Sequence, residues 1–359
     1  MPPPPVYICR LNEDDIVVQQ TSPHYRSQSL IISFKRTIRV PDNAEVAQLP
    51  PGLGDFRLFK TRDFASKLPA DITTQAGVFF TLYQSEAMWV DFKADHPFAI
   101  KIYAGGVNAV SGEHSLETKE TKMRRLDLIA EGKNIQDYVV VPTQMWIDGF
   151  AVAPGGVRQF VAMPLGTGYS VEAQLTGQET NSVIHMVLRL RGGGWYGPMG
   201  VAAGGKIKQV IRKDGENPEI WVPASTIMIS VHILTTMMFR HVTGQKPPKC
   251  PISASTYVDA GLPFFHLPEE PSGISGAFDG IKSVNEINVD HGLASGDEPD
   301  VKPQVVTIQP REDVATNSWV DMETVQDPDG LVNPNGPLRA FRTLKILDDE
   351  LEENNGEAE

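Results

Sequence analysis

Met88-Trp-Val-Asp-Phe-Lys93 is the stretch that decides the fold class, because it alternates Met, Val and Phe with Trp, Asp and Lys. Successive side chains on a β-strand point to opposite faces, so this alternation predicts a strand with one buried face. Phe98-Ala-Ile-Lys-Ile-Tyr103 repeats the alternation after His96-Pro97. We therefore expect the two stretches to form a hairpin or adjacent strands.

Apolar runs on both sides of this stretch predict further strands at residues 6–9, 16–18, 30–34, 138–141, 149–152, 157–163, 169–175, 183–190, 207–211 and 227–234. A charged segment at 116–132 with helical spacing of its apolar residues predicts a helix that ends at Gly132. Shorter helices are expected at 63–68, 253–260 and 338–351. Many short strands with Gly and Pro between them favour an antiparallel arrangement over alternating β-α units.

The sequence thus predicts a mainly β protein, with an antiparallel sandwich or jelly-roll-like first domain and a second, less regular β-containing region. The expected parts are an N-terminal extended segment (1–45), a β-sandwich domain (46–191), a glycine-rich linker (192–206), a second β-containing region (207–290), and a loop-rich C-terminal segment with an acidic tail (291–359).

Composition predicts a soluble, cytoplasmic protein. The two cysteines, Cys9 and Cys250, stand far apart and outside any metal or redox motif, so we expect free thiols. The N-terminal prolines lack the basic flank and apolar run of a secretory signal. The uncharged stretch from Ile220 to Phe239 is long enough to span a membrane. Its polar residues and its alternation predict a strand instead, so we expect no membrane span.

The net charge of −13 is spread unevenly, because residues 348–359 carry seven acidic side chains and leave −6 for the rest of the chain. Binding to a phosphate backbone needs a cluster of basic residues that displaces counterions. The sequence shows no such cluster, so we expect no nucleic-acid partner.

Two short motifs come close to known functional patterns. Gly200-Val-Ala-Ala-Gly-Gly-Lys206 fits the start of a phosphate-binding loop, but Ile207 stands where that loop needs a hydroxyl for Mg²⁺. We therefore interpret it as part of the glycine linker. Leu188-Arg-Leu-Arg-Gly-Gly193 matches the C-terminal tail of ubiquitin, yet Gly194 and a long stretch follow, so no carboxylate is free for conjugation. An ordinary strand explains that segment.

The eight histidines show no helix-spaced or finger-spaced pairs, so the sequence predicts no metal site and no cofactor. Ligands dispersed over strands stay an alternative, with His96, His185 and His232 on expected strands or their edges. The densest cluster of aromatic and polar residues surrounds Trp146. An indole beside Asp and Gln can stack on a sugar or a peptide, although tryptophan more often fills a core. The candidate binding residues are Gln144, Trp146, Asp148, Arg189 and Arg191.

At these residues the chain resembles a family of uncharacterised proteins from fungal and bacterial genomes, over about residues 37–285. The resemblance rests on Glu86-Ala-Met-Trp89, Pro97-Phe-Ala-Ile-Lys101, Gly105-Gly-Val-Asn-Ala-Val-Ser-Gly112, Gln136-Asp-Tyr-Val-Val-Val-Pro142, Trp146-Ile-Asp-Gly149, Val157-Arg-Gln-Phe-Val-Ala-Met-Pro-Leu-Gly166, Gly168-Tyr169 and Gln174-Leu-Thr-Gly177. It implies a shared architecture and no particular substrate.

Three functions follow as hypotheses. The leading one is a non-enzymatic β-rich interaction or structural protein that binds a protein or a glycan, because the strand pattern is ordered and no catalytic motif accompanies it. The alternative is a metal-dependent enzyme of jelly-roll type with ligands dispersed on strands. The third is a ubiquitin-like modifier or processed precursor, which would be cleaved after Gly193.

Overall fold

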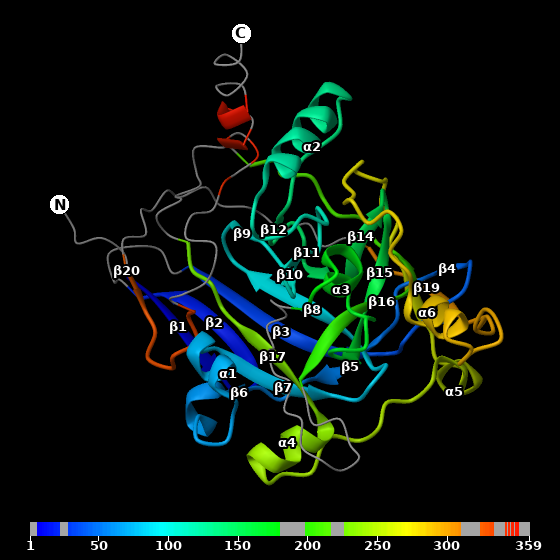
Figure 1. Cartoon of the computed structure of the whole chain (residues 1–359), viewed down its shortest axis with the longest axis horizontal. Helices are drawn as coiled ribbons and strands as arrows, with labels where there is room; N and C mark the ends of the chain where they lie inside the picture. Colours follow the sequence, from blue (N-terminus) through cyan, green and yellow to red (C-terminus); the bar gives the residue numbers. More distant parts are fainter. Residues whose placement is uncertain are drawn as a thin grey trace.

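A computed structural model describes residues 6–21, 28–179, 198–216, 226–309 and 324–333, and in the C-terminal segment residues 342, 344, 346, 347 and 349–351. Its main feature is a large, mostly antiparallel sheet (Figure 1). Along the sheet the order is β20 (Thr324–Gln326), β1 (Val6–Asn12), β2 (Asp15–Gln20), β3 (Ser29–Thr37), β8 (Ala87–Ala94), β15 (Gly156–Pro164), β16 (Met199–Lys208) and β4 (Val46–Ala47). β5 (Gly52–Asp55), β13 (Trp146–Ile147) and β14 (Gly149–Ala153) pair with β3, β8 and β15. The mainly β prediction is confirmed.

Smaller sheets and helices surround the large sheet. The small sheets pair β9 (Phe98–Ile100) with β12 (Val139–Val141), β10 (Tyr103–Ala104) with β11 (Val107–Asn108), β18 (Phe264–His266) with β19 (Val305–Thr307), and β7 (Val78–Leu82) with both β6 (Phe59–Lys60) and β17 (Val231–Thr235). The helices are η1 (Thr61–Phe64), α1 (Ala70–Gln75), α2 (Lys119–Ala130), α3 (Val171–Thr176), α4 (Thr236–Thr243), α5 (Ala254–Asp259) and α6 (Val284–Asp290).

β8 has the alternation that the sequence predicts. Met88, Val90 and Phe92 are buried, whereas Trp89 and Asp91 are half-buried and Lys93 is exposed. The expected hairpin with the next stretch is wrong, because β8 pairs with β3 and β15 while β9 pairs with β12. Alternation identifies a strand but not its partner, and here the three partners of β8, which are β3, β13 and β15, all come from distant parts of the chain.

One hydrophobic cluster joins regions that the sequence suggested were separate. It contains Tyr7 and Ile16 from the first 45 residues, Phe80 and Phe160 from the expected sandwich domain, and Phe239 from the region beyond it. The first 45 residues also supply β1, β2 and β3 to the large sheet. Burial of this shared apolar surface is the main force that holds these strands together.

The expected glycine-rich linker is wrong from residue 199 onward, where the chain forms β16, an inner strand that pairs with β15 on both sides of a β-bulge between Arg158 and Phe160. Its glycines make room for close neighbours. A Cβ atom at Gly200 would lie 2.7 Å from Leu165 Cδ2, and one at Gly204 would lie 2.6 Å from Val161 Cγ2. These glycines are therefore needed for close packing of β16. They do not serve as a flexible linker or as a phosphate-binding loop.

We expect Gly205→Ala to lower the free energy of unfolding by about 1–3 kcal/mol, because overpacking forces backbone shifts of that cost. The added Cβ would lie 2.3 Å from the Pro41 carbonyl oxygen and 2.8 Å from Val40 Cγ2. Gly215→Ala is the control, since no neighbouring atom lies within 4 Å of its added Cβ. Urea unfolding should show a change within about 0.5 kcal/mol for the control. Equal effects at both positions would contradict the packing role.

The strand expected at 169–175 is also wrong, because residues 171–176 form α3. Ser170 caps this helix by accepting a hydrogen bond from the Ala173 N–H at 3.1 Å, and Gly177 ends it in a left-handed conformation with φ 71°. Both are standard helix-boundary residues. The strand expected at 183–190 and the ubiquitin-like segment lie outside the described residues.

Two of the expected helices are confirmed. α2 begins with a capping box between Thr118 and Thr121, and Gly132 follows its end with φ 69°. α5 lies within the predicted 253–260 segment and is capped by Ser253. Leu344, Ile346 and Leu347 are helical, as expected for the C-terminal segment. In the described part of the chain, no helix has both the length and the apolar character that crossing a membrane requires.

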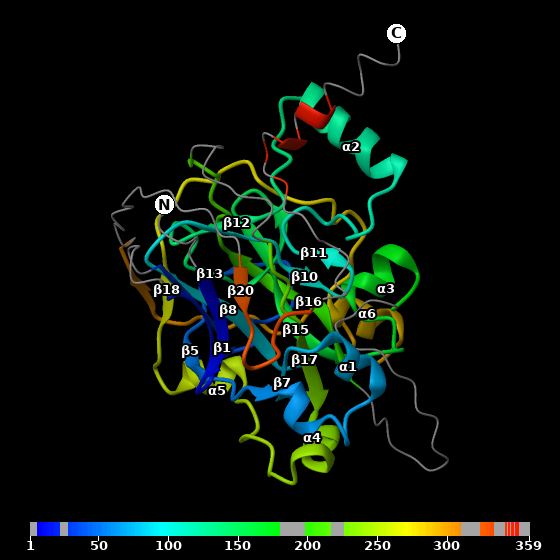
Figure 2. The same ribbon diagram turned by 90° about the vertical axis from the view of Figure 1, so that its left-hand side faces the viewer.

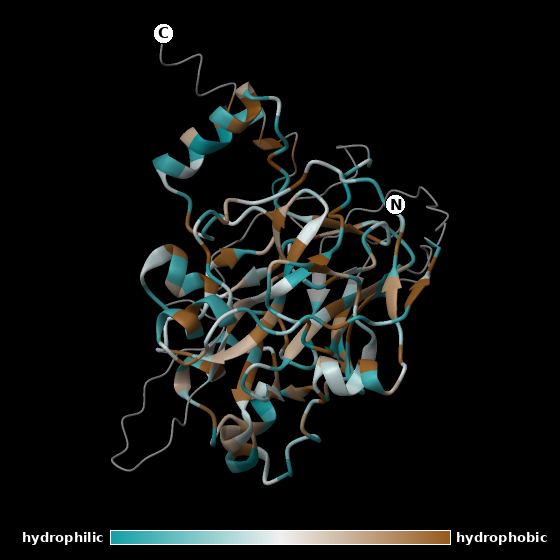
Figure 3. Cartoon of the chain, turned by 90° about the vertical axis from the view of Figure 1, so that its right-hand side faces the viewer, coloured by the Kyte–Doolittle hydropathy of each residue, from teal (hydrophilic) through white to brown (hydrophobic). Residues whose placement is uncertain are grey.

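α2 projects from the body of the protein, and the described helical residues between 344 and 351 lie beside it in two perpendicular views (Figures 1 and 2). In the hydropathy colouring of Figure 3, this projecting helix at the top is largely hydrophilic, with a few apolar positions. The segment between β9 and β12, which contains α2, carries the charged site described next.

Candidate functional site

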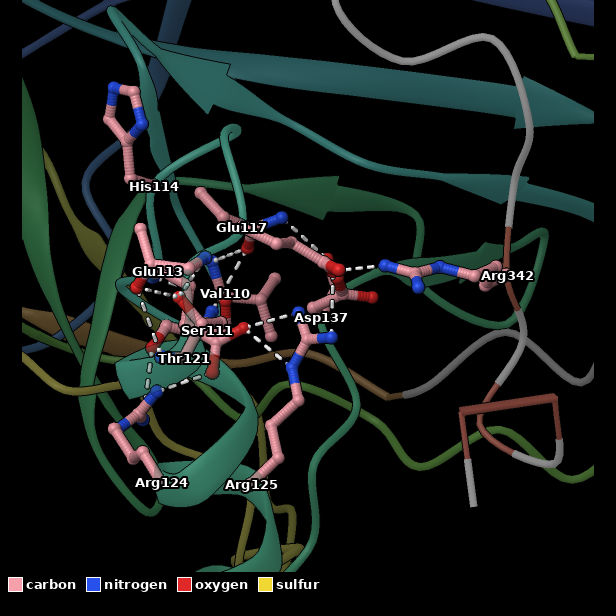
Figure 4. A network of polar contacts seen from close by, with 12 residues as sticks. Val110, Ser111, Glu113, His114, Glu117, Thr121, Arg124, Arg125, Asp137 and Arg342 are labelled. Atoms are coloured by element: carbon pink, nitrogen blue, oxygen red, sulfur yellow. Dashed lines mark hydrogen bonds and ion pairs between the residues drawn. The ribbon is translucent and has the colours of Figure 1, made fainter. Parts of the chain in front are cut away.

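A buried network of charged side chains lies at the base of α2 (Figure 4). It surrounds a small polar cavity whose lining includes Lys101, Asn108, Glu113, Glu117, Arg125 and Asp137. The cavity volume is about 10 Å³. That volume holds about one water molecule, so the cavity as it stands does not fit a metabolite.

Arg125 is the centre of the network. Its Nε and Nη2 atoms donate to Glu113 Oε2 at 2.9 and 2.5 Å, and its Nη1 donates to Glu117 Oε1 at 2.8 Å. Only 4% of Arg125 is exposed. Burial alone would lower the pKa of Arg125, but the hydrogen bonds and charges of Glu113 and Glu117 outweigh burial and raise it. The guanidinium is therefore held in its charged form and fixes the orientation of α2.

The loop that carries Glu113 is itself held by hydrogen bonds. Asn108 Oδ1 accepts from the backbone N–H groups of Val110 and Ser111 at 2.8 and 2.9 Å. Its Nδ2 donates to the Asp137 carbonyl oxygen at 2.8 Å. Arg124 adds a second cation, with Nη1 at 2.6 Å from Glu113 Oε1. The buried Glu113 carboxylate thus has an arginine on each oxygen.

On the other side of the cavity, Lys101 Nζ donates to Asp137 Oδ2 at 2.7 Å, and both side chains are largely buried. Burial raises the pKa of the neighbouring Tyr103, and the negative charge of Asp137 adds to that effect. Tyr103 is therefore a neutral hydrogen-bonding group near neutral pH. Cations and carboxylates alternate around the cavity, so each charge lies next to an opposite one.

The C-terminal segment reaches the same network. Arg342 pairs with Glu117, and its Nη1 lies 2.7 Å from Glu350 Oε2. Burial tends to raise the pKa of Glu117, but Arg125 and Arg342 outweigh burial and lower it. The Leu344 N–H donates to the Tyr138 hydroxyl at 3.3 Å. Leu347 and Leu351 are buried against Ile135, with Leu126 and Leu128 of α2 beside them.

Three of the sequence-derived candidates lie together in a second polar cluster, on and beside β13. Gln144 Nε2 donates to the Trp146 carbonyl oxygen at 2.9 Å, and its Oε1 accepts from the Arg212 N–H at 2.8 Å. Asp148 Oδ2 accepts from Gln209 Nε2 at 2.8 Å. Gln144 and Asp148 are buried, whereas Trp146 is half-buried. The amide and carboxyl groups therefore connect β13 to residues 209–212 inside the protein.

Asp148 is the most perturbed carboxyl group of this second cluster. Burial raises its pKa to about 7, and hydrogen bonds from Trp146 and Gln209 offset part of that effect. A buried carboxylate without a cationic partner is costly, so the neutral acid is favoured. The stability of the folded protein therefore depends on pH.

The remaining candidates do not meet in the described structure. Arg189, Arg191 and His185 lie outside the described residues. His96 Nδ1 lies 3.1 Å from Asp95 Oδ1, and His232 of β17 has its Nε2 3.0 Å from the Ala76 carbonyl oxygen. Within the described ranges, no three His, Cys, Asp or Glu side chains are grouped as metal ligands.

The sequence patterns did not identify the network at the base of α2. The weak signal was the pair Arg124-Arg125 in the middle of a predicted helix, preceded by Glu113 and Glu117. Mid-helix arginines usually belong to a solvated face. Nothing in their spacing shows that Arg125 is buried, because Glu113 reaches it through a loop rather than along the helix.

Comparison with known proteins adds no relative from which a role could be transferred. The chain matches no protein-family model, no curated protein sequence and no solved structure.

Proposed function

We propose that this protein is a non-enzymatic, β-rich interaction protein and that it recognises another protein through α2. The observation that carries the proposal is a projecting helix that buried ion pairs hold in place and that exposes the apolar side chains of Met123 and Ile129 on an otherwise hydrophilic surface (Figure 3). Arg125 and Arg124 fix the helix through Glu113. Met123, on the same helix, is 64% exposed. A rigid element that presents an adaptable apolar side chain suits protein recognition.

Several features favour a protein partner over a small molecule or a glycan. The cavity below α2 has a volume of only about 10 Å³ and its charges pair with each other. Trp146 is half-buried, and its indole hydrogen-bonds the Asp148 side chain instead of lying open as a stacking platform. Besides Met123, Leu116 and Ile129 expose apolar surface near or on α2. The proposal includes a cytoplasmic location, which the free thiols of Cys9 and Cys250 support.

Photo-crosslinking from position 123 tests this function. A photoreactive amino acid in place of Met123 should capture a specific protein in cells, whereas the same amino acid at Met237 should not. Met237 is the matched control because it is a helical methionine with 49% exposure on α4. Mass spectrometry would identify the captured protein.

A charge placed on α2 should then abolish the interaction. We expect Met123→Glu to reduce co-purification of the captured protein by about tenfold or more, the size of effect seen for a central interface contact. Met237→Glu should leave co-purification unchanged. If neither crosslinking position captures a protein, or if both capture the same set, α2 is not the recognition surface.

A further inference from the structure

We propose that the C-terminal segment is an internal ligand: it occupies a surface of the protein that binds an arginine-led amphipathic helix of a partner. This inference rests on the proposed function and names the chemistry of the partner. The surface consists of Glu117, Leu126, Leu128, Ile135 and Tyr138. Arg342, Leu344, Leu347 and Leu351 of the C-terminal segment are seated on it.

The seated segment shows which features the surface recognises. Glu117 pairs with Arg342, the Tyr138 hydroxyl accepts the Leu344 N–H, and Ile135 packs against buried leucines. Leu344, Leu347 and Leu351 are spaced three and four residues apart, as on one face of a helix. A helix laid in a groove is recognised through such a set of anchors. The fitting partner is therefore an amphipathic helix with an arginine just before its apolar stripe.

The contact is separate from the main core. Ile135, Leu347 and Leu351 form their own small cluster, apart from the large cluster that contains most of the buried apolar residues of the main sheet. Elements with few buried contacts to the core can open without global unfolding. Release of the C-terminal segment would therefore expose this small cluster and leave the large one intact.

Release also leaves each charge of this contact with a partner. Glu117 keeps Arg125 at 2.8 Å, and Arg342 keeps Glu350, which lies on the same segment. The Tyr138 hydroxyl keeps its hydrogen bond to Asp214 Oδ2 at 2.6 Å. The main penalty for breaking a buried ion pair is the charge left alone, and here that penalty is avoided. What release does expose is apolar surface, which a partner helix with the same anchors can cover again.

Binding of a labelled peptide to the full-length chain tests the inference. The probe is a fluorescent peptide of residues 340–354, and fluorescence anisotropy gives its affinity. In the wild-type chain the segment in place competes with the peptide, whereas Leu347→Asp with Leu351→Asp should release the segment. We expect the double variant to bind the peptide at least about tenfold more tightly than the wild type, since apparent affinity scales with the fraction of open surface.

Two controls make the result specific. Leu262→Asp replaces an exposed leucine elsewhere and should leave peptide binding at the wild-type level. A peptide that carries Arg342→Glu should bind the double variant at least about tenfold more weakly, because it places a carboxylate against Glu117. If the double variant does not fold by circular dichroism, Arg342→Glu in the full-length chain replaces it, with the same expected gain in binding of the wild-type peptide.

A folded variant that binds the peptide no better than the wild type would overturn the inference, as would equal binding of the two peptides. Light scattering that shows wild-type dimers dissociated by the peptide would also overturn it, because the natural occupant would then be a second copy. Failure of the proposed function gives a different result from failure of this inference. Peptide binding without any capture from position 123 would keep this surface and remove the exposed face of α2 around Met123 as the site of a cellular partner.

Discussion

Replacing Arg125 by methionine should lower the free energy of unfolding by about 3 kcal/mol, the lower end of the range for breaking a buried ion pair. The guanidinium is the shared partner of Glu113 and Glu117, at 2.5 and 2.8 Å. Without it, the buried Glu113 carboxylate keeps only Arg124. The loss falls at the lower end of the range because that second arginine remains. Urea unfolding followed by tryptophan fluorescence measures the effect.

Two further variants test whether the loss of stability in Arg125→Met comes from the buried ion pairs. Glu113→Gln combined with Arg125→Met should recover at least about half of the loss, because a buried neutral group costs less than a buried lone charge. Lys133→Met breaks an exposed pair with Glu131, at 2.6 Å and with 62% and 56% of the side chains exposed. That change should cost at most about 1 kcal/mol. If Arg125→Met and Lys133→Met have the same small effect, the network does not fix α2.

The elements that the sequence predicted correctly are those whose pattern is local. The alternation in β8 lies within eight residues, and α2 has its cap at Thr118 and its stop at Gly132 within one short segment. The sequence patterns did not predict β16 or α3. The cause was long-range for β16 and local for α3. The glycines of β16 are required by neighbours far away in the chain, such as Pro41 beside Gly205. In α3, a short apolar stretch satisfied both periodicities, and the cap at Ser170 was the better signal.

The sequence alone could not predict the charged site, because the residues that pair in it are far apart in the chain and meet only in the folded protein. Arg125 and Glu113 are 12 residues apart, and Arg342 and Glu117 are 225 apart. Charge pairs between residues so far apart produce no periodic pattern in the sequence. The second cluster was found in part, because Gln144, Trp146 and Asp148 stand close together in the chain. Their burial was not visible, since it depends on Gln209, which is 61 residues from Asp148.

The two clusters differ in how their charges are balanced. Around Arg125, cations and carboxylates are interleaved, so burial is compensated by pairing. Around Asp148, the partners are an indole and an amide, and these are neutral donors that offset burial only in part. We therefore expect the free energy of unfolding to depend strongly on which side chains are present in the first cluster. In the second cluster, we expect it to depend on pH.

Asp148 should make the protein less stable as the pH rises through the range from about 4 to 7. Its pKa is raised from 3.8 to about 7 in the folded state, so between these values the folded protein binds more protons than the unfolded chain. The free energy of unfolding then falls with rising pH and levels off above about 7. From pH 5.5 to pH 8 this one group should lower it by about 2 kcal/mol, at about 1.4 kcal/mol for each pKa unit.

Asp148→Asn removes this dependence, because an amide stays neutral throughout the range. The difference in unfolding free energy between variant and wild type should therefore shift in favour of the variant by about 2 kcal/mol from pH 5.5 to pH 8. Urea unfolding of both proteins at four pH values gives the two curves. Asp259→Asn, at an exposed position at the end of α5, is the control, and its curve should run parallel to the wild type. If the Asp148→Asn curve is also parallel, Asp148 is already ionised in the folded protein at pH 5.5, and neutral donors alone stabilise its charge.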